Sequence, residues 1–171
     1  MKSPVAAPAL EAIEASALRG ALGRFATGVT LATCSGLDGR PVGLTVNSFN
    51  ALSLEPPLVL WSLRLQSPSV RDFDAAACFA INVLSDDQVE LSRRFAASTM
   101  ADRFDEGLWH RGLGDAPLLG GCSAHFECET VSRQDAGDHR LYIGRVLRLQ
   151  HQPLAPLIFH AGHYHLLGEV L

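Results

Sequence analysis

Residues 25–61 read FATGVTLATCSGLDGRPVGLTVNSFNALSLEPPLVLW, and this stretch decides the fold. Two strand-like runs, 29–35 and 41–47, flank the tetrapeptide Leu37-Asp38-Gly39-Arg40, and an Asp-Gly pair between such runs is typical of a β-hairpin. The run that ends in Trp61 follows two prolines and is almost wholly apolar, which predicts a strand buried on both faces. The stretch therefore predicts neighbouring antiparallel strands near the start of the chain.

Between these strands the sequence places five small polar side chains within nine positions. A hydroxyl or amide group costs free energy when it is buried without a partner, so something polar must meet this segment. A bound ligand is one such partner, and a neighbouring loop of the protein is the other. The residues are Thr45, Asn47, Ser48, Asn50 and Ser53.

The rest of the chain predicts about three helices and several more strands. An amphipathic pattern over residues 10–26 predicts a helix that ends at Thr27-Gly28, and Ser67-Pro68-Ser69 predicts a second helix with Ser67 as its N-cap. Ser85 to Gln88 has the form of a capping box, which predicts a third helix. Residues 106–121 are rich in glycine and resemble a loop. Further strands are expected at 78–84, 123–134, 139–150, 156–160 and 163–168.

This order of elements predicts a mostly β fold. Strands and helices do not alternate regularly, and no GxGxxG follows a strand, so a dinucleotide-binding α/β sheet is excluded. An antiparallel β-barrel with about three peripheral helices fits best. We expect residues 1–9 to be a disordered leader and residues 10–171 to form a single domain.

Composition excludes several classes of protein. The formal net charge of −4 argues against a nucleic-acid surface, and no apolar run is long enough to span a membrane. The four cysteines show no CxxC spacing, so we expect free thiols in a reducing, cytoplasmic compartment.

Four motifs together give the chain a likeness to a known family. They are FATGVT at 25–30, T-x-N-S-F at 45–49, S-L-E-P-P at 53–57 and G-D-H at 137–139. With them, residues 15–168 resemble the short-chain flavin reductases, the reductase components of two-component flavin-dependent monooxygenases. The resemblance implies an FMN-binding split β-barrel that forms a homodimer. It also implies FMN or FAD as the flavin, NADH or NADPH as the hydride donor, and a partner monooxygenase that receives the reduced flavin.

The resemblance also implies a set of flavin-binding residues. In the family, a segment at the position of Ser67 and Ser69 contacts the flavin phosphate, and a helix N-terminus can bind such an anion. N-capping alone would equally explain Ser67. Arg103 either neutralises the phosphate or belongs to a solvated charge run. The expected flavin-binding set is Gly28, Val29, Thr30, Thr45, Val46, Asn47, Ser48, Ser53, Ser62, Ser67, Ser69 and Arg103.

Three other residues are expected to bind the nicotinamide nucleotide. In the family the histidine of G-D-H contacts this nucleotide, so His139 takes that role with Asp138 orienting its ring, and Tyr164 matches an aromatic residue of the closing segment. Without the resemblance, Gly137 and Asp138 would be read as an ordinary hairpin turn.

Two other interpretations remain open at this point. One is a barrel that binds flavin or haem without turnover. The other is a metal site at His160, His163 and His165, which we do not expect because tetrahedral zinc requires three or four convergent ligands. The sequence therefore predicts an NAD(P)H-dependent flavin reductase with no metal.

Overall fold

The computed structural model describes residues 12–97 and 103–170. Within these ranges the strands are β1 Thr27–Gly28, β2 Thr30–Ser35, β3 Pro41–Val46, β4 Asn50–Leu54, β5 Pro57–Arg64, β6 Cys78–Val83, β7 Trp109–Arg111, β8 Pro117–Leu119, β9 Ala124–Ala136, β10 His139–His151, β11 Ile158–His160 and β12 His163–His165. The α-helices are α1 Ala15–Leu22, α2 Val70–Ala75 and α3 Val89–Ala96. Short 3-10 turns lie at Asp86–Gln88 and Leu113–Asp115.

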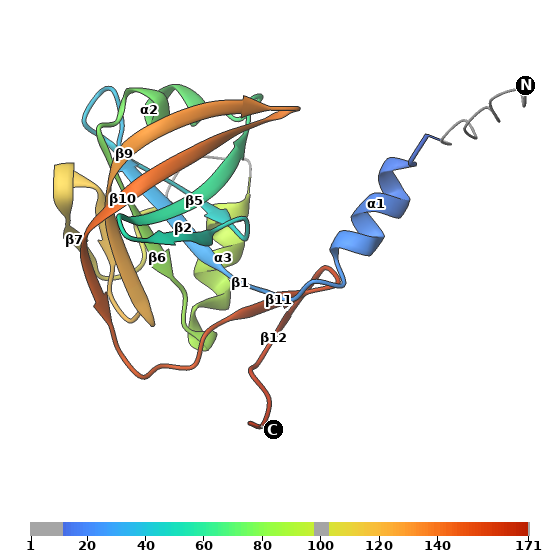
Figure 1. Ribbon diagram of the computed structural model, residues 1–171. Helices are drawn as coiled ribbons and strands as arrows, with labels where there is room; N and C mark the ends of the chain where they lie inside the picture. Colours follow the sequence, from blue (N-terminus) through green and yellow to red (C-terminus); the bar gives the residue numbers. More distant parts are fainter. Residues whose placement is uncertain (1–11, 98–102, 171) are drawn as a thin grey trace, which may run out of the picture.

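The centre of the molecule is a seven-stranded antiparallel sheet in the order β3-β2-β6-β9-β10-β5-β4 (Figure 1). A smaller sheet, β1-β11-β12, lies beside it, and β7 pairs with β8. The prediction of a mostly β, antiparallel fold with three helices is thereby confirmed. Residues 1–9, the expected leader, lie outside the described residues, and the single domain over 10–171 stays a prediction.

Two apolar clusters form the core. One fills the concave side of the large sheet, where Trp61 is fully buried and stacks on Tyr142 with ring centroids 4.7 Å apart. The other lies under α3, where Phe95 packs edge-on against Phe104. The second cluster joins the small sheet to the body, because Phe159 of β11 and Tyr164 of β12 pack against it.

Two local predictions are confirmed. β2 and β3 form the hairpin expected around Asp38-Gly39, and Gly39 has a φ of +76°, a conformation that glycine adopts without strain. Ser85 and Gln88 form the capping box, in which the backbone N–H of Ser85 donates to Oε1 of Gln88 at 3.1 Å.

The first helix differs from its prediction. It spans only Ala15–Leu22, and the predicted end at Thr27-Gly28 is wrong because these residues form β1 and pair with β11. None of its residues is buried, and Phe25 just beyond it is 74% exposed. Figure 1 shows α1 projecting from the body, and none of its apolar residues belongs to either core cluster of the described residues.

Three further expectations are wrong. β5 is not buried on both faces: Val59, Trp61 and Leu63 point into the core, whereas the alternate residues are partly exposed or exposed. The second helix begins at Val70 with Ser69 as its N-cap, because Ser67 lies in the preceding turn. Residues 106–121 are not simply a loop, since they contain the β7–β8 pair.

Candidate functional site

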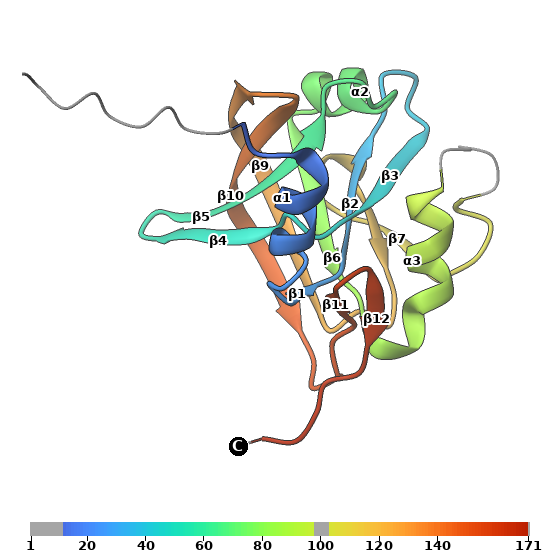
Figure 2. The ribbon, with the colours of Figure 1, turned by 90° about the vertical axis from the view of Figure 1, so that its right-hand side faces the viewer.

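A cavity of about 910 Å³ lies where α1, the small sheet and the link between β3 and β4 meet. This volume falls within the range of small-molecule sites. In Figure 2 the helix α1 lies in front of the large sheet and above β11 and β12. The lining residues are Ser16, Arg19, Gly20, Leu22, Gly23, Arg24, Phe25, Thr27, Asn47, Ser48, Phe159, His160, Ala161 and Gly162.

The floor of the cavity carries a polar atom that lacks a partner. Oγ1 of Thr27 is buried and makes no hydrogen bond within the described part of the chain. Thr27 is held in place by β1, which pairs it with Phe159. A buried hydroxyl without a partner is costly, and because this oxygen has almost no accessible surface, a ligand atom would reach it only after a local rearrangement of the lining.

The predicted polar segment contributes to the cavity through Asn47 and Ser48. Asn47 is exposed, and its amide makes no hydrogen bond with the described residues. The Ser48 hydroxyl, by contrast, accepts a bond from the Ser62 N–H at 3.0 Å and donates to the Ser62 carbonyl at 3.1 Å. Of the two predicted residues in the lining, only Asn47 therefore has a free side chain.

Other hydroxyls of the predicted flavin set are also occupied by the protein. Thr45 donates to the Ser92 carbonyl at 2.7 Å, and Thr30 donates to the Val46 carbonyl at 3.0 Å. The hydroxyls of Thr45 and Thr30 therefore have partners within the protein, which was the alternative to a bound ligand. The backbone of Gly28 stays open, because a Cβ built there would meet nothing within 4 Å.

The remaining members of the predicted flavin set do not line this cavity. Val29 and Val46 are buried in the core, and Ser53 lies in β4 opposite Leu58. Ser69 is buried, and the Ser67 hydroxyl accepts a long hydrogen bond of 3.4 Å from the Ser69 N–H. Their contact with a phosphate stays a prediction.

Arg103 is only 6% exposed, so the solvated charge run considered for it is wrong. Its guanidinium donates to the Gly43 carbonyl at 3.1 Å and to the Ala97 carbonyl, which ties β3 to the end of α3. Burial lowers the pKa of this arginine. These two bonds use only part of the five N–H donors of the guanidinium, and the phosphate role of Arg103 stays a prediction.

The Gly137-Asp138 turn joins β9 to β10 and carries His139. Nδ1 of His139 lies 2.7 Å from Oδ1 of Asp138, and this hydrogen bond lowers the pKa of the Asp138 carboxyl. His139 pairs with Arg64 of β5, and the Leu65 N–H donates to the Asp138 carbonyl at 3.0 Å. The turn therefore lies beside the segment that leads to Ser67.

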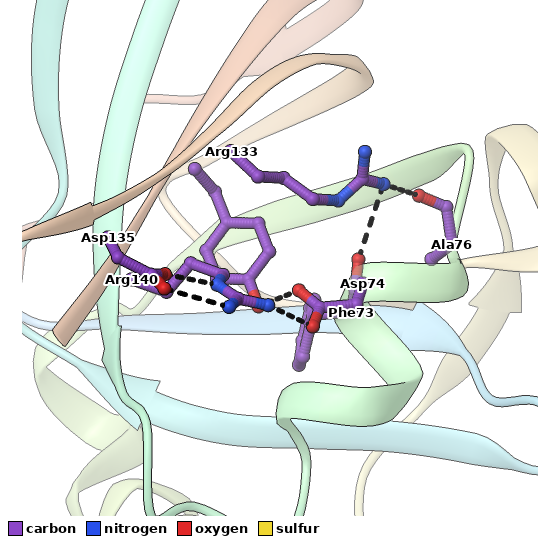
Figure 3. A network of polar contacts seen from close by, with 7 residues as sticks. Phe73, Asp74, Ala76, Arg133, Asp135 and Arg140 are labelled. Atoms are coloured by element: carbon purple, nitrogen blue, oxygen red, sulfur yellow. Dashed lines mark hydrogen bonds and ion pairs between the residues drawn. The ribbon is translucent and has the colours of Figure 1, made fainter.

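A network of charged residues holds this turn (Figure 3). Arg140 donates from Nε to Oδ1 of Asp135 at 2.7 Å and from Nη2 to Oδ2 at 3.2 Å, and its Nη1 contacts Asp74 of α2. The Tyr142 hydroxyl also donates to Asp74, at 2.9 Å. Arg133 donates to the Ala76 carbonyl at 2.8 Å. These bonds fix the β9–β10 hairpin to α2 directly behind His139.

Tyr164 is not among the lining residues, although its ring lies 5.5 Å, centroid to centroid, from that of the lining residue Phe159. Its hydroxyl shares a hydrogen bond of 2.8 Å with the buried Ser92 hydroxyl, and the guanidinium carbon of Arg93 lies 5.6 Å from its ring centroid. Tyr164 therefore fastens β12 to α3, and its expected contact with the nicotinamide nucleotide stays a prediction.

Sequence reasoning missed the residues that α1 and the small sheet bring to the cavity. Arg19 and Arg24 precede the FATGVT motif and Phe25 is its first residue, and this position was the only available signal for them. His160 was considered only as a metal ligand. Within residues 12–97 and 103–170, no group of three or more histidine, cysteine, aspartate or glutamate side chains could hold a metal ion.

Known proteins resemble this chain over most of its length. The family described as "Flavin reductase like domain" matches residues 22–168. FMN reductase (NADH) SmoA of Agrobacterium fabrum is 45% identical over 146 residues, which cover 85% of this chain and 82% of that protein. The reductase component of the flavin-dependent trigonelline monooxygenase of Acinetobacter baylyi is 41% identical over 86% of this chain, but this match spans only 47% of that longer protein.

A solved structure of a flavin-reducing enzyme is also similar to this chain. NADH:FAD oxidoreductase SgcE6 of Streptomyces globisporus, in complex with NAD and FAD fragments, superposes with a TM-score of 0.84 at 34% identity, covering 91% of this chain and 96% of that one. The chain belongs to the flavin reductase like domain family. Its fold is the split β-barrel of that family, as the resemblance implied.

Proposed function

We propose that this protein is an NAD(P)H-dependent flavin reductase that binds FMN or FAD and supplies reduced flavin to a partner monooxygenase. The observation that carries the proposal is the cavity of about 910 Å³, whose largely apolar lining includes the exposed Asn47 with its free amide. Membership of the family and the NADH-dependent relatives support it. The names of these relatives favour NADH as the donor.

The residues present fit a flavin. Its ring system is large, flat and apolar on its faces, with hydrogen-bonding atoms at its edge, and the cavity offers Phe25 and Phe159 together with Thr27 and Asn47. When both nucleotides are bound, the nicotinamide C4 supplies a hydride that the flavin N5 accepts. The protein has to bind and orient the two rings and exclude water, which is catalysis by proximity. In this scheme Thr27 and Asn47 bind the flavin edge, and His139 contacts the nicotinamide nucleotide.

We also propose a homodimer. The apolar side chains of Leu18 and Leu22 on α1 are exposed, and Leu54 at the end of β4 is 94% exposed, so the described residues leave these side chains uncovered. Figure 2 shows the β4–β5 hairpin projecting from the body. Two-fold pairing is the commonest way to bury such surfaces. Light scattering should give about twice the chain mass of 18.4 kDa, and a monomer well above micromolar concentration would contradict the dimer.

A cytoplasmic location belongs to the same proposal. Its support is the set of free cysteines, Cys34, Cys78, Cys122 and Cys128, which a reducing compartment would preserve. Separately, none of the described helices is long and apolar enough to cross a membrane.

The test is the absorbance of the purified protein mixed with FMN and then with NADH. We expect bleaching of the flavin band and loss of NADH absorbance, both much faster than in protein-free controls. Flavin binding without bleaching would instead indicate the non-catalytic flavin barrel, and a Soret band after haem addition would indicate the haem-binding one.

A further inference from the structure

The arginines of this protein fall into two groups. Several on the body bind a carboxylate, as Arg140 does with Asp135 and Arg40 does with Asp38. Arg19 and Arg24, like Arg71 and Arg145, have no hydrogen-bond or ion-pair partner within the described ranges, but of these four only Arg19 and Arg24 line the cavity. Both side chains are exposed, and an anion bound against this largely apolar lining would give them a charged partner.

The charge of the lining supports this reading. No aspartate or glutamate is among the described residues that line the cavity, although the chain as a whole carries a net charge of −4. The local excess of positive charge is therefore set by α1 and not by the composition of the protein. A helix C-terminus favours a cation in its last turn, which would account for Arg19 but not for Arg24 beyond the end of the helix.

The backbone of both arginines is fixed against the small sheet. The Ala161 N–H of the β11–β12 turn donates to the Gly23 carbonyl at 2.9 Å, and the Arg24 N–H donates to the Ala21 carbonyl at 3.1 Å. The end of α1, which carries Arg19 and leads to Arg24, is therefore tied to the β11–β12 turn beside His160.

We propose that Arg19 and Arg24 bind the phosphate or pyrophosphate group of the nucleotide in this cavity. The inference rests on the proposed function and moves the phosphate contact away from the site predicted by sequence. At that predicted site, which comprises Ser67, Ser69 and Arg103, the Arg103 guanidinium donates to two carbonyls. Ser69, which precedes the six-residue helix α2, is buried. Guanidinium groups match phosphate geometry through paired N–H donors, and the described lining of the cavity contains no other arginine or lysine.

The test compares nucleotides with analogues that lack phosphate. Flavin fluorescence would give the dissociation constants of FMN and riboflavin, and steady-state kinetics would give KM for NADH and for reduced nicotinamide riboside. The proteins are the wild type, Arg19→Gln, Arg24→Gln and the double variant. Arg145→Gln, which removes one exposed charge on β10, is the matched control, and circular dichroism verifies that every variant is folded.

We expect each substitution to weaken one phosphate-bearing ligand by about 10- to 100-fold, while its phosphate-free analogue changes less than about 2-fold. An effect on FMN assigns the site to the flavin phosphate, and an effect on NADH assigns it to the nicotinamide nucleotide. Equal losses for ligands with and without phosphate, or no loss beyond that of Arg145→Gln, would overturn the inference.

The proposed function has a separate readout in the same experiment. A wild-type protein without flavin-dependent NADH oxidation would reject the function. Calorimetric titration of inorganic pyrophosphate into the wild type and the double variant would then still decide the arginine site: loss of binding in the variant supports it, and equal binding or no binding rejects it.

Discussion

The Ser48 side chain hydrogen-bonds both backbone groups of Ser62, accepting from its N–H at 3.0 Å and donating to its carbonyl at 3.1 Å. The pairing of β4 with β5 ends at Leu60, so no residue of β4 pairs with Ser62. The Ser48 hydroxyl instead bonds the backbone N–H and carbonyl of Ser62. It closes the gap between the two ends of the seven-stranded sheet at the point where Asn47 enters the cavity.

Ser48→Ala should lower the stability of the fold. The substitution leaves the Ser62 N–H and carbonyl without their partner, which costs about 1–3 kcal/mol of unfolding free energy. Urea denaturation measures the loss. Ser53→Ala on the neighbouring strand is the control and should change stability by less than about 0.5 kcal/mol. Equal stability of Ser48→Ala and the wild type would contradict the closing role of Ser48.

The ion pair between Asp135 and Arg140, drawn in Figure 3, should make the stability of the fold depend on pH. The hydrogen bond from Arg140 lowers the pKa of Asp135, so the contribution of the pair is present above the ordinary aspartate pKa of about 3.9 and is lost as pH falls through the lower folded value. We expect Asp135→Asn to lower the melting temperature at pH 6, with a difference that shrinks toward pH 2. A difference that is constant over this range would show that the carboxylate charge is not involved.

The four cysteines should be nearly inert in the folded protein. Burial raises the pKa of Cys34, Cys122 and Cys128 to about 12, and it also raises that of the partly buried Cys78. Because the thiolate is the reactive form, a thiol reagent at pH 8 should label less than one cysteine per chain within minutes, against all four in denaturant. Rapid labelling of two or more in the native protein would contradict the described packing.

Tyr164→Phe should separate a structural role from a nicotinamide role. The change removes the hydrogen bond to Ser92 and should cost about 0.5–1.5 kcal/mol of unfolding free energy while leaving KM for NADH within about 2-fold of the wild type. Thermal unfolding and steady-state kinetics on the same preparation make the comparison. A raised KM at unchanged stability would restore the contact expected from the sequence.

Local interactions were readable from the sequence, and distant ones were not. Asp38-Gly39 and the Ser85–Gln88 box involve residues within four positions, so their patterns predicted the observed hairpin and helix start. The partners of Thr45 and Tyr164 on α3 lie 47 and 72 residues away, and no local pattern encodes such pairs.

The cavity shows the same limit. It forms because β1 pairs with β11 across more than a hundred residues, which brings the end of α1 to the β11–β12 turn. The polar segment around Asn47 could be recognised as unusual from its composition. The part of the cavity lining that α1 and the β11–β12 turn supply could not be recognised in this way. The amphipathic pattern predicted the helix α1, but not that its apolar residues would stay outside both core clusters.

His139→Ala should impair use of the nicotinamide nucleotide and leave flavin binding nearly unchanged. His139 lies at the start of β10, outside the cavity lining, and its Nδ1 hydrogen-bonds to Oδ1 of Asp138 at 2.7 Å. Loss of one hydrogen bond to the nucleotide, at about 0.5–1.5 kcal/mol, corresponds to about a 2- to 13-fold fall in kcat/KM for NADH. Asp138→Asn keeps the shape of the turn but removes the charge beside the ring, so it should give a smaller fall. Flavin titration of the same proteins checks the other half of the prediction. Wild-type NADH kinetics together with weakened FMN binding in His139→Ala would assign this histidine to the flavin instead.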